Sequence, residues 1–264
     1  MKRGGRSRCS AERGLLRNMI RAFRCDLHVH TCLSPCADLD MYPSALVGRA
    51  VVEKLDVIAI CDHNASENVP HVIRAARGSG LTVLPGMEIT SREEVHLLAL
   101  FDQMDCLQRL QDIVYSHLPG INDESRFGCQ AIVNELDEVE GFNERLLIGA
   151  TELALADLVR YIHDFGGLTV ASHIDRESFS VISQLGFVDP EIPFDALEIS
   201  RRIGLTGARR KYPELVRYPF LTSSDAHRCE EIGKGFTEFF LEEPSVHELK
   251  MAFSGQGGRR IAGF

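Results

Sequence analysis

The sequence lacks any long hydrophobic run, although hydrophobic residues make up 44% of its 264 positions. A membrane-spanning helix needs roughly 18 or more consecutive apolar residues, and no run approaches that length. The Arg-rich start, residues 1–24, also lacks the apolar segment of a secretory signal peptide. Together these absences predict a cytoplasmic protein with no membrane partner.

The eight cysteines show no C-x-x-C spacing, the pattern of many zinc and thiol redox sites. Scattered cysteines in a chain without a secretory signal favour a reduced protein over one held by disulfides. Four of them stand within a few residues of the candidate ligands described below. Thiolate ligation is an alternative for these four, but we expect them to be small packing residues: Cys32, Cys36, Cys61 and Cys229.

The formal net charge is −9, but it is unevenly distributed along the chain. Residues 1–24 hold eight of the 29 basic side chains and only one of the 38 acids, so the remainder is strongly acidic. An acidic domain suits the binding of cations and lacks the overall basic character that is typical of nucleic-acid-binding proteins. We therefore expect residues 1–23 to be a basic, disordered extension and residues 24–264 to form the folded domain.

The stretch from Arg24 to His30 predicts a strand, because Leu27 and Val29 alternate with polar residues. Side chains at positions i and i+2 of a strand share one face, so His28 and His30 project together. Paired imidazoles commonly bind a transition metal. A polar, solvent-facing edge strand is the alternative for this motif taken alone.

Predicted strands and helices alternate along most of the chain, which is typical of an α/β fold with a parallel sheet. Residues 102–149 do not fit this alternation. Within them, 106–117 predicts a helix, and 129–136 with 140–148 predict either a hairpin or two short helices. We interpret 102–149 as a small insertion that caps the domain or lines its pocket.

Histidine and acidic side chains cluster at the predicted carboxyl ends of successive strands. In a closed α/β barrel this end carries the active site, whereas an open doubly wound sheet collects its ligands at one switch point. Because six or more strands contribute here, the pattern favours a barrel.

Six short motifs, in this order, resemble the PHP (polymerase and histidinol phosphatase) family: Asp26–Thr31, Cys61–Asn64, Gly86–Glu88, Val95–Leu98, Ala171–His173 and Ser223–His227. The resemblance implies a distorted seven-stranded (β/α)7 TIM-like barrel. It also implies a cluster of two or three divalent metals that hydrolyses phosphate esters, which would make the protein a metal-dependent phosphoric ester hydrolase.

The family pattern assigns ligands residue by residue. It implies a first metal bound by His28, His30, Glu88 and Asp225. It implies a second bound by Glu88, His96 and His173, and a third bound by His63, His227 and Asp38. The loop before Asp38 departs from the family's Ser-Asp-Gly and is longer, so Asp40 or Cys36 is an alternative third-site ligand; if none reaches the metal, the site is dinuclear.

Metal chemistry then predicts the mechanism. A hydroxide between two cations is nucleophilic at neutral pH, because the metals lower the pKa of the bound water. Asp26 and Asp62 are placed to orient imidazoles, and Asp62 is also a candidate proton relay. Arg201 and Arg202 follow a strand end and either grip the substrate phosphate or are ordinary surface residues. The mixed nitrogen and oxygen ligands suit Zn, Mn or Fe.

Three other functions compete with hydrolysis of a phosphorylated small molecule or nucleotide. An exonuclease on RNA or DNA would use the same site, but a Lys- and Arg-lined groove is then expected. A non-catalytic metal-binding regulatory barrel is the second. An amidohydrolase, the third, often needs a lysine at a strand end, and none of the five lysines ends a predicted strand.

Overall fold

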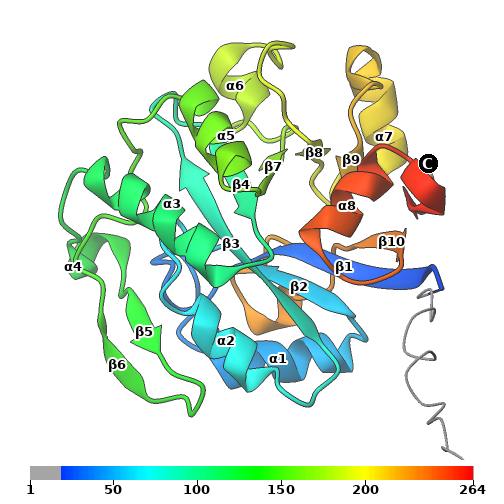
Figure 1. Ribbon diagram of the computed structural model, residues 1–264. Helices are drawn as coiled ribbons and strands as arrows, with labels where there is room; N and C mark the ends of the chain where they lie inside the picture. Colours follow the sequence, from blue (N-terminus) through cyan, green and yellow to red (C-terminus); the bar gives the residue numbers. More distant parts are fainter. Residues whose placement is uncertain (1–18, 264) are drawn as a thin grey trace, which may run out of the picture.

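The computed structural model describes residues 19–263. The chain forms one curled sheet with helices around it and a separate two-stranded hairpin (Figure 1). The strands are β1 Arg21–Val29, β2 Val57–Ile60, β3 Thr82–Thr90, β4 His96–Leu100, β5 Ala131–Val133, β6 Val139–Phe142, β7 Leu168–Ala171, β8 Ala196–Glu198, β9 Phe220–Leu221, β10 Thr237–Leu241 and β11 Arg260–Ile261. The α-helices are α1 Pro43–Val52, α2 Val69–Ala75, α3 Met104–Ser116, α4 Glu124–Phe127, α5 Leu155–Asp164, α6 Val181–Leu185, α7 Gly204–Lys211 and α8 Val246–Phe253.

The first strand begins earlier than the sequence predicts. Arg21, Ala22 and Phe23 belong to β1 and pair with β10, so they are part of the sheet rather than of the expected extension. The rest of that predicted extension, residues 1–18, lies outside the described residues. No helix within residues 19–263 has the length and apolar character needed to cross a bilayer.

The large sheet has nine strands in the order β11-β10-β1-β2-β3-β4-β7-β8-β9. An isolated parallel bridge between Val29 and Ala226 brings the segment after β9 beside β1, so the sheet curls into a half-barrel. The α/β class is confirmed. The expected count of seven strands is not, because β10 and β11 extend the sheet beyond β1.

One strand runs against its neighbours. β4 pairs antiparallel with both β3 and β7, whereas a parallel sheet was expected. The cause is the connection, since only residues 91–95 separate β3 from β4, and a parallel crossover needs a dozen or more residues. His96 therefore stands at the start of its strand, not near the carboxyl end that the barrel pattern predicts for the site.

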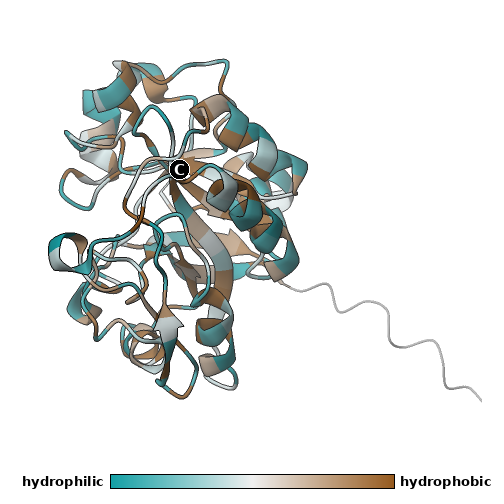
Figure 2. Ribbon diagram, turned by 90° about the vertical axis from the view of Figure 1, so that its left-hand side faces the viewer, coloured by the Kyte–Doolittle hydropathy of each residue, from teal (hydrophilic) through white to brown (hydrophobic). Residues whose placement is uncertain are grey.

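Apolar residues fill both faces of the sheet. One cluster packs the strands against the surrounding helices and includes Val29; the other includes Leu27 and is closed by residues of α8. The register of β1 against β2 shifts between Asp26 and Val29, next to His28. The strands are mostly brown in Figure 2, whereas the helices show both colours.

The insertion contains α3, α4 and the β5–β6 hairpin, so the hairpin alternative is the correct one. Buried Asn68 anchors it, because its amide donates to the Ala131 carbonyl (3.1 Å) and accepts from the Val133 amide (3.0 Å). At the other end, Asn64 donates to the carbonyls of Leu147 and Gly149, both at 2.8 Å. The insertion is therefore held beside the segment that follows β2.

Candidate metal centre

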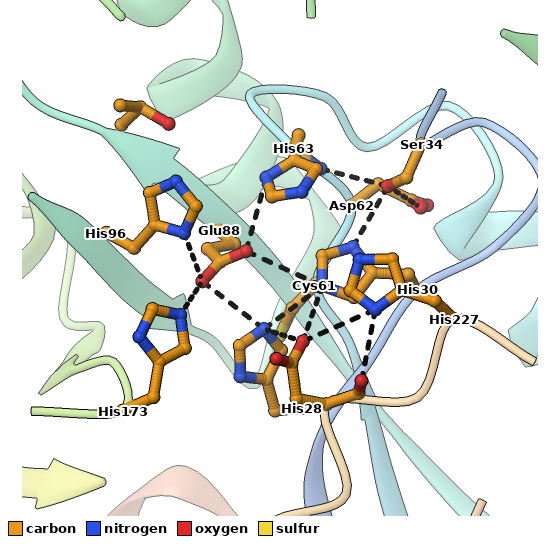
Figure 3. Close-up of polar contacts among 12 residues, drawn as sticks. His28, His30, Ser34, Cys61, Asp62, His63, Glu88, His96, His173 and His227 are labelled. Atoms are coloured by element: carbon orange, nitrogen blue, oxygen red, sulfur yellow. Dashed lines mark hydrogen bonds and ion pairs between the residues drawn. The ribbon is translucent and has the colours of Figure 1, made fainter. Parts of the chain in front are cut away.

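Eight of the predicted ligands meet at one mouth of the curled sheet (Figure 3). They arrive from β1, from the end of β2, from β3, from the start of β4, and from the segments after β7 and β9. Three groups have ligand atoms within 4.8 Å of one another: His30 with His63 and His227; His28 with His30 and Asp225; and His63 with Glu88 and His96. Side chains as far apart in the sequence as His30 and His227 are thus brought close together.

Glu88 lies at the centre of this cluster, as Figure 3 shows. One carboxylate oxygen, Oε1, is 3.0 Å from His96 Nδ1 and 3.4 Å from both His173 Nε2 and His28 Nε2. The other, Oε2, is 3.2 Å from His63 Nδ1. Glu88 is 1% exposed, so this one buried carboxylate is shared among several imidazoles.

Several buried polar atoms of the cluster make no contact with hydrogen-bond geometry: Nδ1 of His63, His96 and His173, and Oε1 of Glu88. Nδ1 of His63 and of His96 each lie near a Glu88 oxygen, but only as ion pairs. Buried polar atoms left unpaired are costly and uncommon in folded proteins. Imidazole nitrogens and carboxylate oxygens are the donors that divalent transition metals prefer, so this arrangement fits bound cations.

The protonation of three of these groups, His30, His63 and Glu88, agrees with that fit. Burial and the neighbouring His227 imidazole lower the pKa of His30 to about 3, and burial lowers the pKa of His63 well below its ordinary value. Burial alone would raise the pKa of Glu88, but the imidazoles of His96 and His28 hold it well below the usual range. Neutral imidazoles beside an ionised carboxylate are the forms that bind metals.

Glu198, on β8, supports the cluster from behind, and sequence reasoning missed it. Its carboxylate is 3.0 Å from His28 Nδ1 and accepts a hydrogen bond from the His173 amide at 3.1 Å. A proton on Nδ1 of His28 leaves Nε2 facing Glu88 and Asp225. Burial disfavours the His28 cation, but Glu198 and Glu88 raise the pKa of His28 well above its ordinary value. The only feature of the sequence that could have indicated this role is that Glu198 is an acid within a mostly apolar predicted strand.

Asp62 and Asp26 orient the site rather than entering it. Asp62 accepts hydrogen bonds from the Thr31 amide (2.7 Å) and from Ser34 Oγ (2.6 Å), and Ser34 Oγ lies 3.0 Å from His30 Nδ1. Asp26 accepts from the amides of Ser224 and Gly233 at 2.8 and 2.9 Å. It thereby fixes the segment that carries Asp225 and His227.

Comparison with known proteins identifies the family. The family model described as the PHP domain matches residues 26–184, more than half of the chain. A second model, described as PHP-associated, matches residues 210–254. The chain belongs to the PHP domain family.

Relatives of this PHP protein differ in size. It is 32% identical over 253 residues to the uncharacterized protein YqxK of Bacillus subtilis, covering 89% of this chain and 63% of YqxK. It is 26% identical over 254 residues to a PolC-type DNA polymerase III of Caldanaerobacter subterraneus subsp. tengcongensis, covering 83% of this chain and 17% of that protein. The chain thus spans less than two thirds of these relatives.

Solved structures share the fold of this PHP protein. The lesion-specific endonuclease Q of Pyrococcus furiosus superposes with a TM-score of 0.71 at 16% identity, over 91% of this chain and 58% of that chain. The structure of an endonuclease Q complex with a 27-mer duplex substrate, which has an abasic lesion at the active site, superposes with a TM-score of 0.68.

Beside the PHP cluster lies a cavity of about 220 Å³ lined by Arg176, Arg201 and Arg202 among other residues. Arg176, which sequence reasoning also missed, places Nη2 2.5 Å from Asp225 Oδ2. Arg201 pairs with Glu231 at 3.1 Å. Both predicted arginines therefore face the cavity, and Arg176 lies closest to the candidate ligands.

The proposed third-site acid is not brought into the cluster. The Asp38 carboxylate is 54% exposed and lies 3.5 Å from Arg228 Nε, and only its backbone amide approaches the site, donating to the His227 carbonyl at 2.9 Å. The alternatives Asp40 and Cys36 are also exposed. Among the described residues, none of the three belongs to a close ligand group.

Proposed function

We propose that the protein is a metal-dependent hydrolase of phosphate esters whose cluster binds two or three divalent cations, Zn, Mn or Fe. The observation that carries this proposal is the ring of imidazoles around Glu88, whose buried nitrogens face its carboxylate without forming hydrogen bonds. His28, His30, Glu88 and Asp225 would hold one cation, Glu88, His96 and His173 a second, and His63 and His227 a third.

Divalent cations bound there would lower the pKa of water and neutralise charge on phosphate oxygens. The chain's own residues would position the reacting groups. Glu198 fixes the ring of His28, and Asp62 acts on His30 through Ser34. Arg176, with Arg201 and Arg202 further along the cavity, would bind the phosphate by paired N–H donors.

The substrate class we favour is a nucleotide or another phosphorylated small molecule. Nucleic acid is the second candidate, because Arg201 and Arg202 also line the cavity and would offer donors to a second phosphate. The relatives named as a DNA polymerase and an endonuclease point the same way. The acidic body of the chain favours short substrates over long duplexes.

Two substitutions test the assignment. We expect His30→Ala and Asp225→Ala each to lower turnover of phosphomonoesters and short oligonucleotides by at least a thousandfold, because each removes a candidate ligand of the first cation. His247→Ala, which changes an exposed histidine remote from the site, is the matched control. Circular dichroism checks that all three variants fold, and wild-type rates in His30→Ala would refute the proposal.

Metal analysis tests the number of cations. Elemental analysis of purified protein after loading should give two or three equivalents per chain, and His63→Ala should lose one relative to the wild type. Asp38→Asn should leave the stoichiometry unchanged, since the Asp38 carboxylate faces Arg228. Loss of one equivalent in Asp38→Asn would instead restore Asp38 as a ligand.

A further inference from the structure

Phe179 adopts a backbone conformation that a phenylalanine rarely occupies. Its φ is +56°, in the left-handed region where the Cβ of a bulky residue crowds the carbonyl oxygen. Such strain persists only where the surrounding structure enforces it, and it concentrates at functional sites. His173 and Asp225, both candidate ligands, share the feature, so Phe179 belongs to a strained rim around the cluster.

The ring of Phe179 lies flat on a candidate ligand. Its centroid is 4.6 Å from that of His96, and the two planes differ by 17°. The contact is fixed from the backbone, because the His96 amide donates to the Phe179 carbonyl at 2.9 Å. Figure 3 places His96 at the edge of the cluster, away from His30 and His227.

Burial in the core does not explain why a phenylalanine occupies this strained position. Phe179 is 39% exposed, so a large part of its apolar surface gains nothing from the core, while the backbone still bears the strain. A glycine or an asparagine would relieve that strain. One ring face covers His96, and the exposed surface is available to a planar partner.

The same loop places the positively charged side chain of Arg176 on the other side of the site. Arg176 and Phe179 are three residues apart; Arg176 pairs with Asp225, and Phe179 covers His96. A ligand whose phosphate lies at the cluster would therefore find an arginine on one side and an aromatic ring on the other. Nucleotides combine an anionic group with a planar base.

We propose that Phe179 is a stacking platform for a nucleobase of the substrate. This inference rests on the proposed function and narrows it to nucleotides or short single strands. Stacking on an aromatic side chain accepts every base, because each has a π-face. Phe179 would therefore favour substrates that carry a base over substrates without one, and it would not distinguish one base from another.

A fluorescence experiment tests the platform without relying on turnover. The chain contains no tryptophan, so Phe179→Trp introduces a single emitter at the proposed site. Adenosine 5′-phosphate should quench its emission within seconds of mixing, whereas ribose 5-phosphate, which lacks the base, should not. Phe187→Trp is the matched control, since Phe187 is 58% exposed and outside the site, and should respond to neither compound. Equal responses of Phe179→Trp to both compounds would overturn the platform.

A selectivity measurement gives the second test. For Phe179→Leu, the ratio of kcat/KM for adenosine 5′-phosphate to that for ribose 5-phosphate should fall about tenfold, which is the loss of one base-stacking contact. Phe187→Leu should keep the wild-type ratio. An unchanged ratio in Phe179→Leu, with both rates and the metal content reduced, would mean that Phe179 acts only through His96 and would refute the proposal.

The two hypotheses fail in different ways. If wild-type protein hydrolyses no phosphoester, the proposed function is wrong, yet base-dependent quenching of Phe179→Trp would still establish the platform. If the wild type is active but neither the quenching nor the ratio depends on the base, the phosphoesterase remains and the platform is wrong.

Discussion

Glu198 illustrates how a residue outside the cluster can govern it. Its carboxylate touches one candidate ligand through a ring nitrogen and the next through a backbone amide. A carboxylate that accepts a proton from a ligating imidazole fixes the orientation of the ring and strengthens it as a donor. At the residue scale, the geometry of the site therefore depends on a side chain that would touch no metal.

Glu198→Gln should weaken metal binding by roughly 10- to 100-fold, because the amide keeps the shape but loses the charge that orients His28. Competition with a chromophoric chelator measures the affinity. Glu191→Gln, at an exposed position, is the matched control and should bind metal as the wild type does. Equal affinities in both variants would show that His28 needs no such support.

Connections between elements decide which residues were predictable. His28, His63 and His173 stand within or directly after strands whose apolar pattern is plain, so their convergence could be predicted. The direction of β4 could not be predicted from its own periodicity, although the short turn before it held the information. Arg176 and Glu198 carry no spacing signal, because their partners lie 49 and 170 positions away. Asp38 sits in a loop of altered length, whose path only the fold determines.

Polar contacts of Asp195 connect β7, β8 and α5 at the end of the sheet opposite the cluster. Asp195, just before β8, accepts hydrogen bonds from the amide of Thr169 on β7 (2.8 Å) and pairs with His163 of α5 (2.9 Å). Burial would raise the pKa of Asp195, but the bonds from His163 and Thr169 lower it below its ordinary value of 3.8. The ionised form therefore stabilises the native arrangement.

Asp195→Asn should destabilise the protein by about 1–3 kcal/mol at pH 7, the usual cost of losing hydrogen bonds to a charged group. A carboxyl with a lowered native pKa contributes stability above its unfolded pKa and loses it as the pH falls through the native one. The difference in unfolding free energy between wild type and variant should thus shrink below about pH 4. Urea titrations at pH 7 and pH 3 measure it, and a constant difference would contradict the assignment.

The ligands of the cluster come from segments spread over most of the sequence, from position 28 to position 227. A cation that binds only the folded state shifts the whole unfolding equilibrium. We expect saturating Mn or Zn to raise the Tm of chelator-treated protein by roughly 5–10 °C, which corresponds to about 3 kcal/mol for a chain of this size. Differential scanning calorimetry checks this, and His30→Ala, which removes a ligand of one cation, should show a smaller rise. A metal-independent Tm in the wild type would argue against a cation at the cluster.

The turn between β3 and β4 restricts where insertions and deletions are tolerated in related proteins. Residues 91–95 reverse the chain and pair His96 with Thr90, which brings the imidazole within reach of the Glu88 carboxylate two positions earlier on β3. One inserted residue would rotate the imidazole to the other face of the sheet. The long connection from α3 to α5 carries no such constraint, because none of its residues joins the close ligand groups. We expect insertions and deletions among descendants of a common ancestor to accumulate in that connection, while the short reversal keeps its five residues.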